Sequence, residues 1–149
     1  MPKLGTPWEV LLVEDNAGDT TLFMMAMRES GDGQIHVSCV ADGLQALDFL
    51  YRKGRHGNAP RPNLIFLDLN IPVLDGRRVL EELKKDARLA DIPVIILSTS
   101  TAKTDIADSY RRGANSYIVK PADVNVLFET MRTCRAYWFG TVALNSSGR

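Results

Sequence analysis

The sequence has neither a long apolar run nor an excess of charge of one sign. None of its 149 residues fall in a stretch of about 18 consecutive apolar residues, the length that a membrane-spanning helix needs. Lysine and arginine number 18, aspartate and glutamate also number 18, and no block of like charge occurs. Nucleic-acid and membrane-surface partners usually require such a block, so we expect a water-soluble protein with no nucleic acid and no membrane partner.

Cysteine is also scarce. Cys39 and Cys134 lie far apart and form neither a CxxC nor a CxxH pattern, and the first residues contain no apolar signal-peptide core. These features predict a reduced, cytoplasmic protein. The chain length fits one ordinary domain, and we find no internal repeat.

Five short apolar runs predict β-strands. They lie at 8–14, 35–40, 63–68, 92–98 and 116–120. The first, third and fourth runs lack polar alternation and are rich in Val, Ile and Leu, which is typical of parallel strands covered on both faces. A segment with helical periodicity follows each run, so strand and helix alternate five times. We expect an α/β fold with a parallel sheet and right-handed crossovers.

The predicted domain covers residues 8–137, with an N-terminal tail at 1–7 and a C-terminal tail at 138–149. The C-terminal tail ends in small polar residues, so we expect it to fray. Asp75 and Asp123 stand where they can cap the third and fifth helices. We expect no output domain.

Polar side chains follow the predicted strands, at the point where each strand ends. They are Glu14 and Asp15 after the first strand, Asp68 after the third, Ser98 and Thr99 at the fourth, and Lys120 at the fifth. The carboxyl ends of parallel strands meet at one edge of the sheet, which is where open α/β sheets bind ligands. We therefore expect these groups to lie close together.

Three clustered carboxylates repel one another by roughly 4 kcal/mol for each pair at 4 Å and an effective dielectric near 20. One lysine cannot balance that charge, whereas a divalent cation can. Carboxylate oxygens suit Mg²⁺, and Mn²⁺ or Ca²⁺ could substitute for it. The alternative is that the acids only cap the helices that follow them.

Four segments carry a resemblance to a known family. "LLVED", "LIFLDLNIPVLDG", "IPVIILST" and "SYIVKP" occur in this order and resemble the receiver domain of bacterial two-component response regulators. The likeness extends over about residues 8–137. It implies a flavodoxin-like fold, with a five-stranded sheet in the order 2-1-3-4-5 and five helices on both faces.

The resemblance also implies roles for individual residues. Asp68 resembles the phosphoacceptor, and the metal would be held by Glu14, Asp15, Asp68 and the backbone carbonyl of Asn70. The phosphoryl-contacting and switch positions would be Ser98, Thr99, Lys120 and Tyr117. Thr99 departs from the alanine that is frequent in the family, and Asn70 occupies a position that tunes access of water. These roles have alternatives: Lys120 could be an ordinary surface lysine, and Tyr117 could be a half-buried aromatic residue on a strand.

A narrower resemblance concerns the partners. The loop "NAPRPN", the segment "LDLNIP" and the continuation through "YWFGTVAL" resemble single-domain regulators paired with phytochrome histidine kinases. Kinase docking is expected near the first helix, where Met24 and Met25 add adaptable apolar surface. The group also implies a homodimer through the fourth helix, fifth strand and fifth helix. Candidate contact residues are Tyr110, Phe128, Tyr137, Trp138 and Phe139, which could instead complete the monomer core.

Two other functions remain open at this point. A degenerate receiver would act only as an interaction module, and an aspartyl-phosphate phosphatase would be an enzyme. Such phosphatases usually carry a second aspartate two residues after the nucleophile, where this sequence has Asn70. We therefore predict a phosphoaccepting signalling protein and not an enzyme.

Overall fold

The computed structural model describes residues 6–28 and 34–146. Positions 1–5 and 147–149 of the two predicted tails lie outside the described residues. Among the described residues, no helix combines the length and the apolar character needed to cross a membrane.

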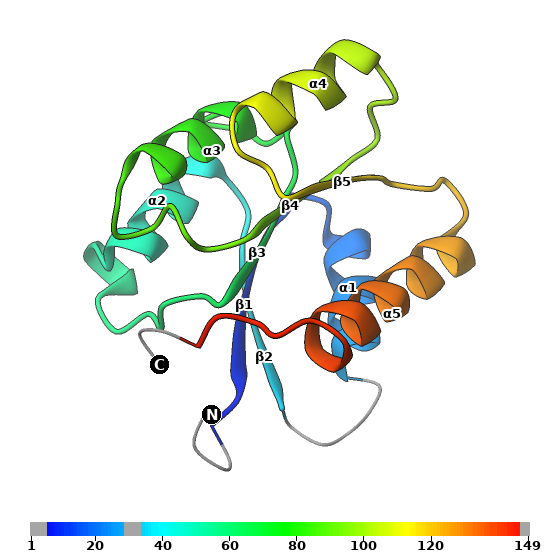
Figure 1. The fold of residues 1–149 in the computed structure, drawn as a ribbon, viewed down its shortest axis with the longest axis horizontal. Helices are drawn as coiled ribbons and strands as arrows, with labels where there is room; N and C mark the ends of the chain where they lie inside the picture. The colour runs from blue at the N-terminus through cyan, green and yellow to red at the C-terminus, as the bar shows by residue number, and fades with distance from the viewer. Residues whose placement is uncertain (1–5, 29–33, 147–149) are drawn as a thin grey trace.

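Strands and helices alternate along the chain (Figure 1). The strands are β1 (Trp8–Val13), β2 (Ile35–Val40), β3 (Leu64–Leu67), β4 (Val94–Ser98) and β5 (Ser116–Val119). The helices are α1 (Ala17–Arg28), α2 (Gly43–Tyr51), α3 (Gly76–Lys85), α4 (Lys103–Arg111) and α5 (Val124–Gly140), with a short 3₁₀ turn at Gly54–His56. Each predicted apolar run forms a strand, which confirms the element order.

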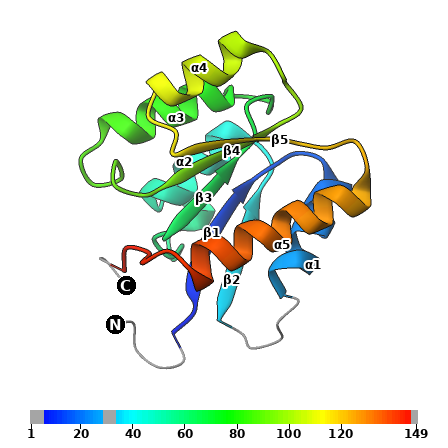
Figure 2. The same ribbon diagram turned by 45° about the vertical axis from the view of Figure 1, so that its right-hand side comes forward.

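The five strands form one parallel sheet in the order β2-β1-β3-β4-β5. The predicted strand order and the flavodoxin-like fold class are therefore confirmed. Helices α1 and α5 lie side by side on one face, and α2 and α3 cover the other (Figures 1 and 2). The sheet order changes direction at β1, so the carboxyl ends of β1 and β3 border the edge where such sheets bind ligands.

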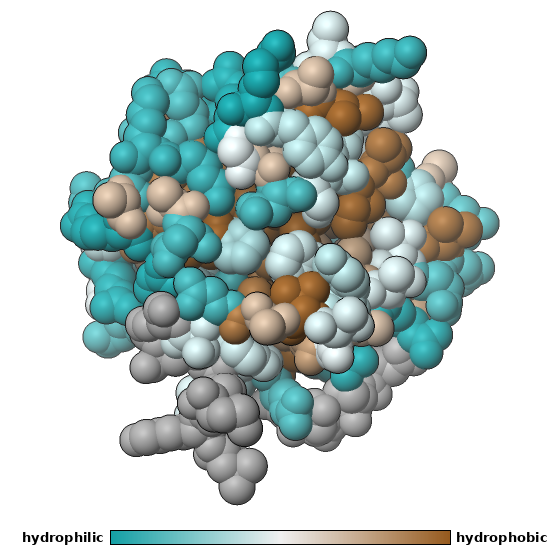
Figure 3. Space-filling model, in the orientation of Figure 1, coloured by the Kyte–Doolittle hydropathy of each residue, from teal (hydrophilic) through white to brown (hydrophobic). Residues whose placement is uncertain are grey.

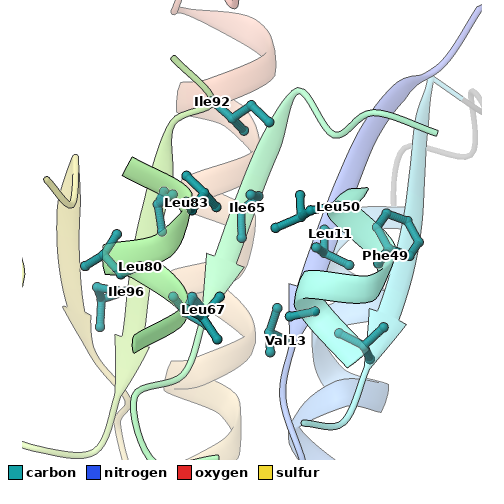
Figure 4. Close-up of a cluster of buried hydrophobic side chains, with 14 of the residues drawn as sticks. Leu11, Val13, Phe49, Leu50, Ile65, Leu67, Leu80, Leu83, Ile92 and Ile96 are labelled. Atoms are coloured by element: carbon teal, nitrogen blue, oxygen red, sulfur yellow. The ribbon is translucent and has the colours of Figure 1, made fainter. Parts of the chain in front are cut away.

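Side chains along each strand alternate between the two faces of the sheet and so form two separate hydrophobic cores. Val10 and Leu12 of β1 pack with α1 and α5, whereas Leu11 and Val13 pack with α2 and α3. Because successive side chains of a strand point to opposite faces, strands buried on both sides must be apolar throughout. The α2 and α3 side is drawn in Figure 4, where the labelled residues are Leu11, Val13, Phe49, Leu50, Ile65, Leu67, Leu80, Leu83, Ile92 and Ile96.

Aspartates begin two of the helices, as predicted. The Asp75 carboxylate accepts a hydrogen bond from the Arg77 backbone N–H at 2.8 Å, and Asp123 does the same for Asn125 at 2.8 Å. These contacts satisfy backbone donors that have no partner within the first helical turn. They fix where α3 and α5 start, and therefore how the loops before them run.

The end of the chain departs from the expected frayed tail. Helix α5 continues to Gly140, so the predicted boundary after residue 137 falls inside a helix. The Asn63 side chain then donates to the carbonyl of Asn145 at 3.2 Å, and the Asn145 side chain donates to Asp91 at 3.2 Å. These long-range bonds fasten the segment beside the amino end of β3, and composition alone does not reveal them.

Candidate functional site

Backbone hydrogen bonds bring the predicted site residues to one edge of the sheet. The Asp68 N–H donates to the Val13 carbonyl at 3.1 Å, which places Asp68 beside the end of β1. The Lys120 N–H donates to the Ser98 carbonyl at 2.7 Å, which aligns the ends of β4 and β5. The acidic pair after β1, Asp68 and Lys120 therefore share the edge that the sequence predicted.

Burial divides the site residues into two groups. Glu14, Asp68, Ser98 and Lys120 are buried. Asp15, Asn70 and Thr99 are exposed and form the rim. An isolated buried carboxylate is costly, so the buried acids need a partner of opposite charge.

Lys120 is that partner. Its Nζ lies 3.1 Å from Asp68 Oδ2, and it also binds Glu14. A third carboxylate, that of Asp19 in the first turn of α1, lies 3.1 Å from the same nitrogen. The ammonium therefore joins acids from the ends of β1 and β3 and from α1, which excludes the alternative of a plain surface lysine.

The remaining carboxylate oxygens are held by backbone donors. Asp68 Oδ1 accepts a hydrogen bond from the Asn70 N–H at 3.1 Å, and Glu14 Oε2 accepts one from the Asn16 N–H at 3.1 Å. Each buried acid is therefore fixed by one ammonium contact and one amide contact. Asp15 is exposed at the rim, where its carboxylate is accessible to a ligand.

The acidic group fits a divalent cation. One carboxylate oxygen from each of Glu14, Asp15 and Asp68 lies within 4.8 Å of the others. Lys120 pairs with the carboxylates of Glu14, Asp19 and Asp68, and Asp15 adds a fourth carboxylate at the rim, so the acids outnumber this ammonium and the site carries an excess of negative charge. An oxygen-only donor set of this kind suits a hard ion such as Mg²⁺ or Mn²⁺.

The same contacts shift the ionisation of the buried groups. Burial raises the pKa of Glu14, and the hydrogen bond and charge of Lys120 offset only part of that rise. Burial alone lowers the pKa of Lys120, but its bond to Glu14 and the charges of Asp68 and Glu14 outweigh burial and raise it above the ordinary value. Lys120 therefore stays an ammonium throughout the physiological pH range.

The loop after β3 packs tightly against the site. A Cβ atom on Gly76 would lie 2.2 Å from the carbonyl oxygen of Asp68, so only glycine fits there. Earlier in the same loop, the Leu74 N–H donates to the Pro72 carbonyl at 2.8 Å across Val73, whose φ is 70°. A β-branched residue rarely adopts this left-handed conformation, so the loop stores local strain at Val73.

Among the predicted phosphoryl-contacting and switch residues, Lys120 bonds to the acids, whereas Ser98 and Tyr117 bond to Ser100 in the segment after β4. Ser98 Oγ accepts a hydrogen bond from the Ser100 N–H at 3.2 Å, and Thr99 is exposed. The Tyr117 hydroxyl donates to the Ser100 carbonyl at 2.9 Å. Tyr117 is half-buried against the α2 and α3 core. In this structure it therefore matches the alternative interpretation, a half-buried aromatic residue on a strand.

Asp19 is the site residue that the sequence analysis missed. An acid in the first turn of a helix is ordinary, because it interacts favourably with the helix dipole. The available signal was position: Asp19 stands four residues after Asp15, in the first turn of the helix that follows the acidic pair. That signal indicates proximity to the acidic pair but not the contact with Lys120, which comes from a strand about one hundred residues later.

The predicted partner surfaces are only partly exposed. On α1, Met25 is 56% exposed, whereas Phe23, Ala26 and Met27 are buried. On the α4-β5-α5 face, Tyr110 and Tyr137 are exposed, but Phe128, Trp138 and Phe139 pack against the α1 and α5 core. Three of the five aromatic candidates therefore contribute to the monomer core. Brown apolar surface remains visible between α4 and α5 (Figure 3).

The fold and the site together define a class of protein. The family model for the response regulator receiver domain matches residues 10–132, and the chain belongs to this family. Members of this family are signalling proteins that work with histidine kinases.

Individual relatives are similar over nearly the whole chain. Response regulator Rcp1 from Synechocystis sp. is 40% identical over 139 residues, which cover 93% of each chain. The phosphorylated cyanobacterial phytochrome response regulator RcpA is 41% identical, with a TM-score of 0.91 over 95% of this chain and 100% of that one. The Mn²⁺-bound form of Rcp1 is 38% identical, with a TM-score of 0.89 over 94% of this chain and 100% of that one.

Proposed function

We propose that this receiver accepts a phosphoryl group from a sensor histidine kinase on Asp68, with Mg²⁺ bound at the acidic group. The observation that carries the proposal is the placement of Asp68. Its carboxylate lies 3.1 Å from the Lys120 ammonium and within 4.8 Å of oxygens from Glu14 and Asp15. Phosphoryl transfer depends on positioning and charge neutralisation, and this edge of the sheet offers both.

In the proposed reaction, an Asp68 oxygen attacks phosphorus and forms an acyl phosphate. The bond between phosphorus and the donor imidazole breaks, and the imidazole nitrogen leaves with the bonding electron pair. Lys120 donates to a phosphoryl oxygen, and the Ser98 hydroxyl turns to donate to another. A bound divalent ion, held by Glu14, Asp15, Asp68 and the Asn70 carbonyl, would supply charge neutralisation.

The consequence of phosphorylation would be a change of surface. The modification adds roughly one further negative charge and three acceptor oxygens beside Ser98. An inward movement of Ser98 and Thr99 would disturb the Ser100 carbonyl, to which Tyr117 is bonded. Rotation of Tyr117 would then couple the site to the α4-β5-α5 face as a shift between two populations.

One experiment tests the phosphoacceptor. The protein is incubated with Mg²⁺ and acetyl phosphate, and the intact mass is measured for wild type, Asp68→Asn and the surface control Glu82→Gln. We expect a single phosphoryl adduct on wild type and on the control, and none on Asp68→Asn. No adduct on wild type would favour a degenerate interaction module, and rapid turnover of unrelated phosphate esters would favour a phosphatase.

We also propose a phytochrome kinase as the donor and a homodimer as the output state, in the cytoplasm. The similarity to RcpA, a phytochrome response regulator, supports the first proposal. The exposed side chains of Tyr110, Val119 and Tyr137 on the α4-β5-α5 face support the second. The free cysteines Cys39 and Cys134 suit a reducing compartment.

Sedimentation velocity tests the dimer. Wild type and Tyr137→Ala are compared at tens of micromolar, with and without the phosphoryl analogue beryllium trifluoride. We expect the analogue to promote a dimer of wild type that Tyr137→Ala weakens. Monomers under both conditions would contradict the dimer proposal but leave the phosphoacceptor proposal intact.

A further inference from the structure

The Lys120 ammonium has used all its hydrogen-bonding capacity. A lysine ammonium carries three N–H donors. Its Nζ lies within hydrogen-bond distance of three different carboxylates, those of Glu14, Asp19 and Asp68. A phosphoryl oxygen can therefore bind Lys120 only if one of these acids withdraws.

Burial indicates which acid withdraws. The Glu14 side chain is 2% exposed and that of Asp68 is 10% exposed, whereas that of Asp19 is 29% exposed. A buried carboxylate that loses its partner cannot be resolvated, and the loss is costly. Water reaches Asp19 and can solvate its carboxylate after release. Of the three contacts with Lys120, the one with Asp19 therefore costs the least free energy to break.

The local structure also stabilises Asp19 after its release. The Asn16 side chain accepts a hydrogen bond from the Asp19 N–H at 2.9 Å, and the Asn16 carbonyl accepts one from the Thr20 N–H at 3.0 Å. These bonds fix the first turn of α1, where the helix dipole favours a negative charge. Asp19 can therefore leave Lys120 without disturbing the backbone that carries it.

We propose that Asp19 is a positioning residue that holds Lys120 in the resting site and yields it to the incoming phosphoryl group. The inference rests on the proposed phosphorylation of Asp68. Its consequence is that Asp19 slows phosphorylation, because the contact between Asp19 and Lys120 must break before the transition state is reached. Removing the charge of Asp19 should therefore speed the reaction.

The test measures the initial rate of phosphorylation by acetyl phosphate in the presence of Mg²⁺, followed by intact mass. The variants are Asp19→Asn, Asp19→Ser as a second version, and Glu129→Gln as the control. Glu129 is an exposed acid on α5 that pairs with Arg132. We expect Asp19→Asn to raise the rate by about two- to fivefold, the factor that a partly exposed ion pair is worth, and Glu129→Gln to leave it unchanged.

A second measurement separates a contact with Lys120 from a general effect of charge. The ¹⁵N resonance of the Lys120 ammonium should shift in Asp19→Asn and stay in place in Glu129→Gln. An unchanged or lower rate in both Asp19 variants would overturn the inference, as would a higher rate without any shift of this resonance. If wild type is phosphorylated and only these results fail, the proposed function stands.

Discussion

The hydroxyl of Tyr117 donates a hydrogen bond of 2.9 Å to the backbone carbonyl of Ser100, two residues beyond Ser98. The Ser100 hydroxyl donates to Asp105 of α4 at 2.6 Å, and Asp105 also accepts from Arg77 of α3 at 3.0 Å. Strand β5, the loop after β4, and helices α3 and α4 are thus joined by one set of polar contacts. A movement of this loop must change several of them together.

Replacing Tyr117 with phenylalanine removes only the hydroxyl and leaves the Ser100 carbonyl without this donor. We expect the free energy of unfolding to fall by about 1 kcal/mol, the usual net value of a partly buried hydrogen bond. Urea denaturation measures the change. Tyr137→Phe is the matched control, since Tyr137 is 53% exposed, and it should change the value little. Equal effects from the two variants would contradict a specific role for the Tyr117 hydroxyl.

Replacing Gly76 with alanine places a Cβ atom 2.2 Å from the Asp68 carbonyl oxygen and must push the β3-α3 loop away. We expect a loss of stability of about 1 to 3 kcal/mol, together with slower phosphorylation of Asp68. In Gly140→Ala the same substitution meets nothing within 4 Å, near the end of α5. Alanine favours helix there, so this control should be neutral or slightly stabilising. A well-folded Gly76→Ala protein with the wild-type phosphorylation rate would contradict this prediction.

Removing the exposed acid Asp15 should abolish metal binding while the fold persists, because Asp15 contributes to the metal group without being buried. We expect Mg²⁺ at one hundred times its dissociation constant to stabilise wild type by about 2.7 kcal/mol and Asp15→Asn hardly at all. Thermal unfolding with and without Mg²⁺ measures this difference. Glu82 is a partly exposed acid on α3 outside the acidic group, so Glu82→Gln should respond to Mg²⁺ like wild type.

Met25 should affect transfer from the kinase and not the chemistry at Asp68. Its side chain is exposed on α1, the helix whose first turn carries Asp19 at the acidic edge that must meet the donor. We expect Met25→Lys to slow phosphotransfer from an autophosphorylated phytochrome kinase severalfold and to leave phosphorylation by acetyl phosphate unchanged. Leu44→Lys, at an exposed position on α2, is the control. Equal slowing by both variants would argue against docking at α1.

The buried thiol of Cys134 should lower the free energy of unfolding at alkaline pH. Burial raises the pKa of its thiol to about 11, from an ordinary value of 9. The folded state keeps the proton between these values while the unfolded state loses it, so stability falls as pH rises from about 9 to 11, by at most about 2 kcal/mol. The difference in unfolding free energy between wild type and Cys134→Ala should therefore narrow over this range. A difference independent of pH would contradict the prediction.

Much of the fold and site could be predicted because both depend on local patterns. The apolar runs predicted the strands, and the polar residues after them predicted the acidic edge with Lys120. The contact between Asp19 and Lys120 could not be predicted, because it depends on how α1 packs beside α5 and so meets the loop between β5 and α5. The anchoring of Asn145 to Asn63 and Asp91 could not be predicted either, since nothing in a short polar segment indicates its distant partners.

The division of the sheet into two cores has a consequence for insertions and deletions. One residue added to β3 would exchange the faces of Ile65 and Phe66 and drive each side chain into the wrong core. It would also move Asp68 about 3.3 Å along the strand, away from Lys120. Two constraints therefore fix the length of β3: its side chains must pack into the correct core on each face, and Asp68 at its end must reach Lys120.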